Sequence, residues 1–256
     1  MLRAFFGLVS VLLLVLLSVP VLADFSPATY GAHPNDAGND CLGVQGATQA
    51  AGLAGGGTVQ LEAGVYHLET LSCWQVLWRN VRIVGAGGGG GAWATSDNYA
   101  ASVIRYTLTD GVGLNVIGQG GGNYGAVGLV LERFMLLGPG GSNRAIGFWL
   151  QWGSPHGRGI NVRIFGFNRN FKANNEVFNN DVSTAGFVWT DSIFGEGYVN
   201  AELANGCCMK FVNHVFADGR FSTWRHLGVL PRGEGEGECE RCYFGPMMPN
   251  GVAIEF

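Results

Sequence analysis

Short apolar segments with alternating polar positions, separated by glycine, are the dominant pattern of the chain after residue 55. A period of two residues predicts β-strands, and no helix of crossover length separates the first of them. Strands this short need neighbours on which to stack, so the pattern predicts a solenoid of short strands. The predicted strands are 58–61, 65–68, 81–84, 103–106 and 114–117.

A loose repeat begins near residue 128, in which each segment places a phenylalanine at its fourth position. The spacings between these phenylalanines are 31, 29, 22 and 28 residues, which lie in the range of solenoid repeats. We expect the rings to stack as a ladder inside the core, and the loops of unequal length to build a binding side. The phenylalanines are Phe134, Phe165, Phe194, Phe216 and Phe244.

The segment before the first strands predicts a short helix. Asn39 or Asp40 can cap its first turn, since either side chain accepts a backbone N–H. Glycines within the segment weaken the helix, so it needs tertiary support. We expect it to cover the open first coil, although an ordinary surface helix would show the same pattern. Its predicted apolar face consists of Leu42, Ala47, Ala50, Ala51 and Ala54.

The order of motifs in residues 25–105 resembles the N-terminal part of the pectate-lyase-like superfamily, which holds rhamnogalacturonase-like, epimerase-like and phage-tailspike-like proteins. The resemblance implies an all-β fold, a right-handed parallel β-helix with a short N-terminal capping helix. Glu62 stands where the family more often has proline. The resemblance implies activity on polysaccharides, but the matched motifs are structural, so it assigns no catalytic residue. The motifs are Tyr30-Gly31-Ala32, the Asp-rich turn 35–40, Gly-Gly-Gly-Thr-Val at 55–59, Ala-Gly-Val-Tyr at 63–66 and Val-Gly-Ala-Gly at 84–87.

Residues 1–23 have the pattern of a signal peptide. Arg3 precedes an apolar run, Pro20 ends that run, and Ala23 offers a small residue for cleavage before Asp24. An uncleaved membrane anchor is the alternative, because the run approaches spanning length. We favour cleavage, which predicts a secreted chain without a stable membrane anchor.

The remaining residues, 24–256, are predicted to form one β-helix domain. Its last residues, 251–256, read as another strand without a cap, so we expect either a C-terminally truncated domain or a partner that covers the end. The formal net charge of −4 gives no support for nucleic-acid binding.

Six cysteines in a secreted chain predict disulfides. Their clustering suggests that Cys41 pairs with Cys73, and that Cys207 and Cys208 pair with Cys239 and Cys242. The last four could instead hold zinc, because Cys-x-x-Cys is a ligand spacing, or remain free thiols.

Two acidic residues break the apolar pattern of the repeat. Glu196 and Asp218 each stand two positions after a ladder phenylalanine, where earlier repeats have apolar residues. Carboxylates one or two coils apart would lie about 5–10 Å from each other, a range that suits the acid and base of a glycoside hydrolase. Neighbouring glycines explain both residues equally well as members of turns.

A second set of residues suits a lyase that acts on uronic acids. Such an enzyme needs a cation that neutralises the substrate carboxylate and a base that removes the adjacent proton. Arg220 is the candidate cation, while His214 and Asp191 lie nearby in the sequence. Calcium is a candidate cofactor, with Asp181 as one oxygen ligand, and the tryptophans, Trp149 and Trp189 among them, offer flat faces for sugars.

The resemblance to the pectate-lyase-like superfamily, together with the signal-peptide pattern, implies a secreted carbohydrate-active enzyme, a polysaccharide lyase or a glycoside hydrolase. The alternatives are a non-catalytic carbohydrate-binding or structural β-helix, such as a surface or spike module, and an inactive fragment.

Overall fold

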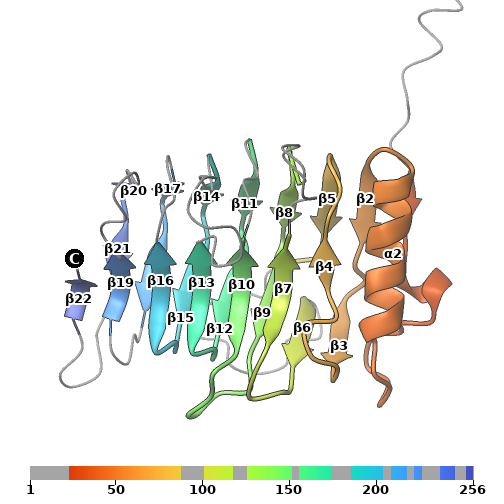
Figure 1. Ribbon diagram of the computed structural model, residues 1–256, viewed down its shortest axis with the longest axis horizontal. Helices are drawn as coiled ribbons and strands as arrows, with labels where there is room; N and C mark the ends of the chain where they lie inside the picture. The colour runs from red at the N-terminus through yellow and green to blue at the C-terminus, as the bar shows by residue number, and fades with distance from the viewer. Residues whose placement is uncertain are drawn as a thin grey trace, which may run out of the picture.

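A computed structural model shows three parallel β-sheets wound into a solenoid, with a helix at one end (Figure 1). It describes residues 23–87, 101–117, 126–151, 156–173, 186–203, 209–217, 222–226, 237–245 and 252–255, and in 222–226 and 252–255 only the backbone. The signal peptide predicted for residues 1–23 lies, apart from Ala23, outside these residues. In the described part of the chain, no helix is long and apolar enough to cross a membrane.

The three sheets are named here A, B and C. Sheet A contains β1 (Asp24–Phe25), β2 (Gly57–Gln60), β5 (Val81–Val84), β8 (Val130–Glu132), β11 (Arg158–Ile160), β14 (Val188–Thr190), β17 (Met209–Val212) and β20 (Gly237–Glu240). Sheet B contains β3 (Gly64–Leu68), β6 (Ser102–Tyr106), β9 (Phe134–Leu137), β12 (Arg163–Phe165), β15 (Ile193–Gly195), β18 (Val215–Ala217) and β21 (Tyr243–Phe244). Sheet C contains β4 (Gln75–Val76), β7 (Val112–Val116), β10 (Ile146–Leu150), β13 (Arg169–Ala173), β16 (Val199–Leu203), β19 (Ser222–His226) and β22 (Val252–Glu255).

The chain visits the sheets in the order A, B, C and then returns to A. Each strand pairs in parallel with the equivalent strand of the next coil, for example β10 with β13 and β12 with β15. In Figure 1 the strands of sheet C lie side by side along the long axis, from β4 near the helix to β22 at the far end. The right-handed parallel β-helix predicted from the sequence is confirmed.

The phenylalanine ladder of sheet B is shorter than the sequence predicts. Phe194, Phe216 and Phe244 occupy one register row, with ring centroids 6.0 and 5.2 Å apart. In β12 the inward position of that row belongs to Ile164, so Phe165 lies on the outer face of the sheet. A shift of one residue moves a side chain to the opposite face of the sheet. A repeat aligned on phenylalanine therefore assigns Phe165 to the wrong face. Phe134 is buried in the core, but it precedes the row by two residues.

The corner between sheets A and B is tight in five successive coils. One residue there has a left-handed backbone conformation, with φ between 50° and 58°. The backbone N–H of Asn161, for example, donates to Thr190 O in the next coil at 2.9 Å. Asparagine and aspartate tolerate this conformation better than most residues. The five corner residues are Arg133, Asn161, Asp191, Asn213 and Arg241.

The connections from sheet C back to sheet A differ in length, in contrast to the A–B corners. They range from four residues (77–80) to fourteen (174–187). The prediction of unequal loops on one side is confirmed only in part, because the longest connection, seventeen residues (85–101), joins β5 of sheet A to β6 of sheet B. The connections from sheet C to sheet A leave the carboxyl ends of the sheet C strands.

The helix α2 (Cys41–Leu53) covers the first coil, together with the short 3-10 helix η1 (Pro27–Tyr30) (Figure 1). The predicted capping helix is confirmed, but its buried face differs from the prediction, because Leu42 is 86% exposed. Gly43 and Gly52 allow close packing, since a Cβ atom at these positions would lie 2.4 Å from Ala32 and 2.1 Å from Trp78. The buried helix residues are Cys41, Gly43, Val44, Ala47, Thr48, Ala51 and Gly52.

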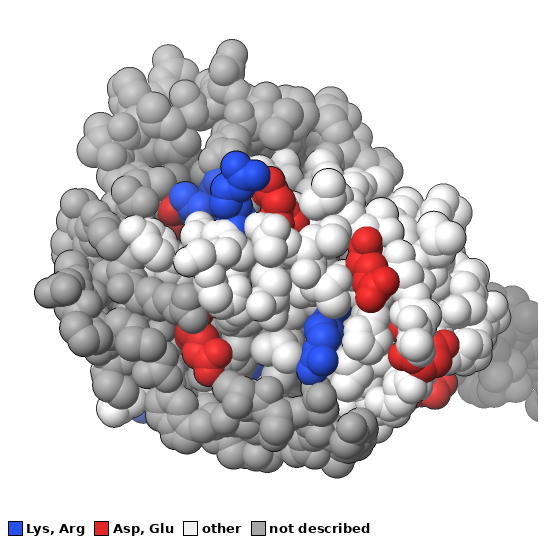
Figure 2. All heavy atoms as spheres, turned by 90° about the horizontal axis from the view of Figure 1, so that it is seen from below, with Lys and Arg blue, Asp and Glu red and all other residues white. Residues whose placement is uncertain are grey.

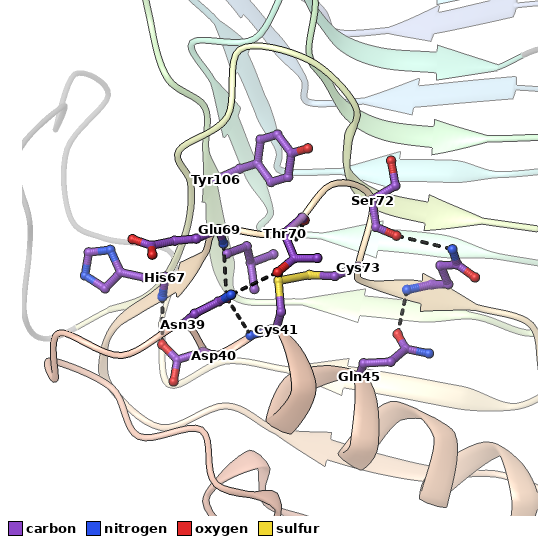
Figure 3. The surroundings of a disulfide bond; sticks show 12 residues. Asn39, Asp40, Cys41, Gln45, His67, Glu69, Thr70, Ser72, Cys73 and Tyr106 are labelled. Carbon is purple, nitrogen blue, oxygen red and sulfur yellow. Dashed lines mark hydrogen bonds between the residues drawn. A yellow bond between two sulfur atoms is a disulfide. The ribbon is translucent and has the colours of Figure 1, made fainter.

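A disulfide between Cys41 and Cys73 joins the start of α2 to the connection between β3 and β4, as the sequence predicts (Figure 3). Asn39 supplies the side-chain cap, because its Oδ1 accepts the backbone N–H of Cys41 at 3.2 Å. Its Nδ2 also donates to Thr70 Oγ1 at 2.9 Å. Asp40 instead accepts the backbone N–H of His67 at 2.7 Å, which fixes the helix to β3.

Candidate functional site

The predicted site residues fall into separate parts of the fold. Asp218 and Arg220 lie outside the described residues, as do Cys207, Cys208 and Asp181. Asp191 and Glu196 lie at opposite ends of β15, the first at the A–B corner and the second at the B–C corner. The described structure therefore does not bring Asp191 and Glu196 together.

Both acidic residues occupy turns with positive φ. Glu196 has φ 56° and follows Gly195, which pairs with Phe165, so its equivalent in the preceding coil is Gly166 with φ 75°. The exposed Asp191 accepts a hydrogen bond from Asn213 Nδ2 at 3.0 Å. Turn geometry thus accounts for the placement of both residues.

His214 lies inside the core and not on a binding surface. Its ring is fully buried, with centroids 4.4 Å from Phe194 and 4.3 Å from Phe216, and among the described residues neither ring nitrogen has a hydrogen-bond partner. Burial lowers the pKa of His214 from 6.5 to about 3. A general base must reach its substrate, and this side chain has no access to a polysaccharide.

A row of polar and aromatic side chains runs along the outer face of sheet C instead. Within each strand the row residue stands between two core residues, as Trp149 does between Phe148 and Leu150. Consecutive members lie on neighbouring strands about 4.8 Å apart, so the row follows the solenoid axis. The members, called here the sheet C row, are Asn115, Trp149, Lys172 and Glu202, with Gln75 paired before Asn115 and the backbone of Arg225 after Glu202.

The centre of the row is an ion cluster. Lys172 Nζ lies 4.6 Å from the centroid of the Trp149 ring and 3.9 Å from Glu202 Oε1. Arg169 Nε donates to Glu202 Oε2 at 2.8 Å. Lys172 and Glu202 are buried, with 7% and 3% of their side chains exposed, whereas Arg169 is 30% exposed. The Glu202 carboxylate therefore has two cationic neighbours, Arg169 and Lys172. Lys172 also lies over the Trp149 ring.

Amide groups extend the cluster along the sheet. Gln151 Nε2 donates to Asn115 Oδ1 at 2.8 Å, and both side chains are buried. The site thus combines a flat aromatic ring, amides, a carboxylate and cations. Aromatic faces and directed polar groups are what a ligand site needs for shape and for orientation.

Sequence reasoning missed this site, although the chain carries a signal for it. Three successive strands read IGFWL, RNFKA and VNAEL, and each has Trp149, Lys172 or Glu202 as the fourth of five residues. The apolar residues on either side mark that position as facing outward. The phenylalanine repeat belongs to sheet B, so it does not align the strands of sheet C.

Charged residues elsewhere are scattered. The face shown in Figure 2 has a few acidic and basic side chains among uncharged ones, and the largest basic group has acidic neighbours. The described part of this face therefore presents no extended field of one sign, and charged recognition depends on local groups.

No family model and no curated protein matches the sequence. Among solved structures, the Agl-KA catalytic domain superposes with a TM-score of 0.64 and 15% identity over 93% of this chain and 46% of that chain. ORF18 of Geobacillus virus E2 gives 0.57 and 15% over 86% and 41%. The catalytic unit of the GH87 α-1,3-glucanase of Streptomyces thermodiastaticus strain HF3-3 gives 0.51 and 14% over 80% and 35%. The chain spans less than half of each, and the likeness confirms the fold expected from the resemblance.

Proposed function

We propose that this protein is a carbohydrate-active enzyme, a polysaccharide lyase or glycoside hydrolase, and that its polysaccharide lies along the outer face of sheet C. The observation that carries the proposal is the buried cluster of Lys172, Glu202 and Arg169 beside Trp149. Burying charges is costly, and apolar residues would make an equally stable sheet, so a cluster kept on the outer face indicates a task other than folding. A row that follows the axis suits a linear polymer.

Two further observations support the proposal. One of the solved structures with this fold is named an α-1,3-glucanase, which supports a carbohydrate substrate by analogy only. The signal-peptide pattern of residues 1–23 supports action outside the cell, where polysaccharides are found.

The balance of charges in the cluster favours a lyase. Glycoside hydrolysis uses two carboxylates, and the described cluster contains one, Glu202, next to two cations. Arg169 has the planar group that binds a uronate carboxylate through two hydrogen bonds. Glu196 and Asp218 remain proposed as the carboxylate pair of a hydrolase, and calcium remains proposed as a cofactor of a lyase.

A non-catalytic carbohydrate-binding β-helix is the second candidate. Lys172 and Glu202 already form an ion pair, and Lys172 also lies over Trp149. Groups paired in this way suit a rigid recognition surface as well as a reacting one.

The product of the reaction separates these candidates. The protein would be incubated with pectic polymers, alginate and neutral α-glucans, with and without a chelator. New ultraviolet absorbance from an unsaturated sugar identifies a lyase, and its loss with the chelator identifies a metal requirement. New reducing ends without that absorbance identify a hydrolase, and retention of polymer without either product identifies a binding protein. Absence of cleavage and of retention across the panel would contradict the proposal.

A further inference from the structure

Cys239 and Cys242 enclose the A–B corner of the last described coil. Cys239 belongs to β20 and pairs with Phe211, a core residue of the coil before, and Cys242 packs against the same core. Arg241 between them has φ 55°, which turns the chain sharply. Cys239 is exposed and Cys242 half-buried, and both are reduced, whereas Cys41 and Cys73 are joined.

The two thiols contact each other and differ in environment. The Cys239 thiol donates a hydrogen bond to the Cys242 sulfur, which lowers the pKa of Cys242, and backbone hydrogen bonds at His214 and Glu240 act in the same direction. The same contact raises the pKa of Cys239. Cys242 Sγ also lies 3.6 Å from Phe211 O. The lowered pKa favours the Cys242 thiolate, and the contact across the corner places the Cys239 sulfur where it can displace a group bound to Cys242.

A metal site fits these two residues less well. Two thiolates supply half of a tetrahedral set, and among the described residues no group of three or more His, Cys, Asp or Glu side chains is placed to hold a metal ion. The geometry of the pair suits covalent chemistry between the sulfurs, because residues spaced Cys-x-x-Cys can form a disulfide across a turn.

We propose that Cys239 and Cys242 form a thiol–disulfide exchange site whose oxidant is an organic disulfide. The Cys242 thiolate attacks one sulfur of the oxidant, forms a mixed disulfide and releases the other half as a thiolate. Cys239 then loses its proton and attacks the Cys242 sulfur, which releases the second thiolate. The two cysteine sulfurs are oxidised by two electrons, and the organic disulfide is reduced to two thiols. The product joins Cys239 in β20 to Cys242, the residue before β21, across the corner.

The test uses the full chain and oxidised glutathione as the probe. After incubation, free thiols are alkylated and peptides are mapped without reduction. We expect one peptide with an internal Cys239–Cys242 bond, and the same product in the Cys207→Ser, Cys208→Ser double variant. Cys239→Ser should accumulate glutathione on Cys242, and in Cys242→Ser the remaining Cys239 should react about tenfold more slowly or less.

Three results would overturn the proposal. One is alkylation of both thiols after oxidation in the wild type. Another is a bond from Cys239 or Cys242 to Cys207 or Cys208. The third is equal reaction rates of the two single variants, which would remove the distinction between the attacking and the resolving thiol.

Discussion

At the scale of single residues, Trp189 depends on a glycine in the neighbouring strand. Trp189 is fully buried, and Gly159 stands beside it in register, where a Cβ atom would lie 2.1 Å from the indole. We expect Gly159→Ala to lower the free energy of unfolding by about 1–3 kcal/mol, because the ring has to move within a packed core. Denaturant titration measures this change.

Gly245→Ala is the matched control for that substitution. A Cβ atom at Gly245 would meet neighbours only at 3.4 Å, an ordinary contact, so its effect should stay within about 0.5 kcal/mol. Equal losses for the two variants would show that strand glycines matter for a reason other than space for Trp189.

The buried histidine should make the fold sensitive to acid. His214 has a folded-state pKa of about 3 against 6.5 for the exposed group, so the unfolded chain binds more protons between these pH values. Its contribution to stability is complete above pH 6.5 and is lost as the pH falls toward 3, by at most about 1.4 kcal/mol per pH unit.

His214→Leu isolates this effect from other titrating groups. The unfolding free energy of the wild type minus that of the variant should fall as the pH is lowered from 7 to 4. A difference that stays constant over this range would mean that His214 is accessible to protons in the folded state.

At the scale of elements, the disulfide should stabilise the capping helix. Cys41 and Cys73 are 32 residues apart, and α2 is otherwise fixed by polar contacts such as Gln45 Oε1 with the backbone N–H of Gln75 at 2.7 Å. The Cys41→Ala, Cys73→Ala double variant should lose about 2–4 kcal/mol of unfolding free energy. A loss below about 0.5 kcal/mol in denaturant titration would show that packing alone holds the cap.

The strands could be predicted because the alternation of apolar and polar residues is visible within each short segment. Val81–Val84 was predicted with its observed bounds, and the strand expected at 65–68 begins one residue earlier, at Gly64. The prediction of a phenylalanine ladder in sheet B was partly wrong. Whether Phe165 or Ile164 faces inward depends on the conformation of the corner before the strand, which strand propensity does not predict. The exposed Leu42 shows the same limit for the helix, because the first coil of the solenoid determines which face of α2 is buried.

The site was harder to predict than the fold for a related reason. Lys172 and Glu202 are 30 residues apart, and only the register between β13 and β16 brings them together. Glu196 breaks the apolar pattern of the repeat. It follows Gly195 in a turn, and the equivalent residue in the preceding coil is Gly166. The sequence shows which residues break the apolar pattern. It does not show which of these residues lie next to each other in the fold, and a site depends on that.

At the scale of the whole molecule, the solenoid turns local strands into a long surface. The sheet C row follows the axis, and the unequal connections leave the same strands at their carboxyl ends. A linear polymer laid along this face would meet the partly exposed Trp149 and Arg169, whose positions the buried Lys172 and Glu202 fix. The outer face of sheet A carries charged pairs too, such as Lys210 with Glu238 at 3.1 Å, but these are more exposed.

Paired measurements on Glu202→Gln and Glu238→Gln test whether the polysaccharide binds along sheet C. Both substitutions keep the side-chain shape and remove one charge from an ion pair, one on sheet C and one on sheet A. The measurement is turnover or retention of the polymer found in the substrate panel, for variants whose thermal unfolding matches that of the wild type. Trp149→Leu serves as a second variant on sheet C if Glu202→Gln does not fold. We expect a loss of about tenfold or more for the sheet C variant, as removal of a charged hydrogen bond implies, and less than about twofold for Glu238→Gln. Equal effects, or a loss confined to Glu238→Gln, would contradict the assignment of the polysaccharide site to sheet C.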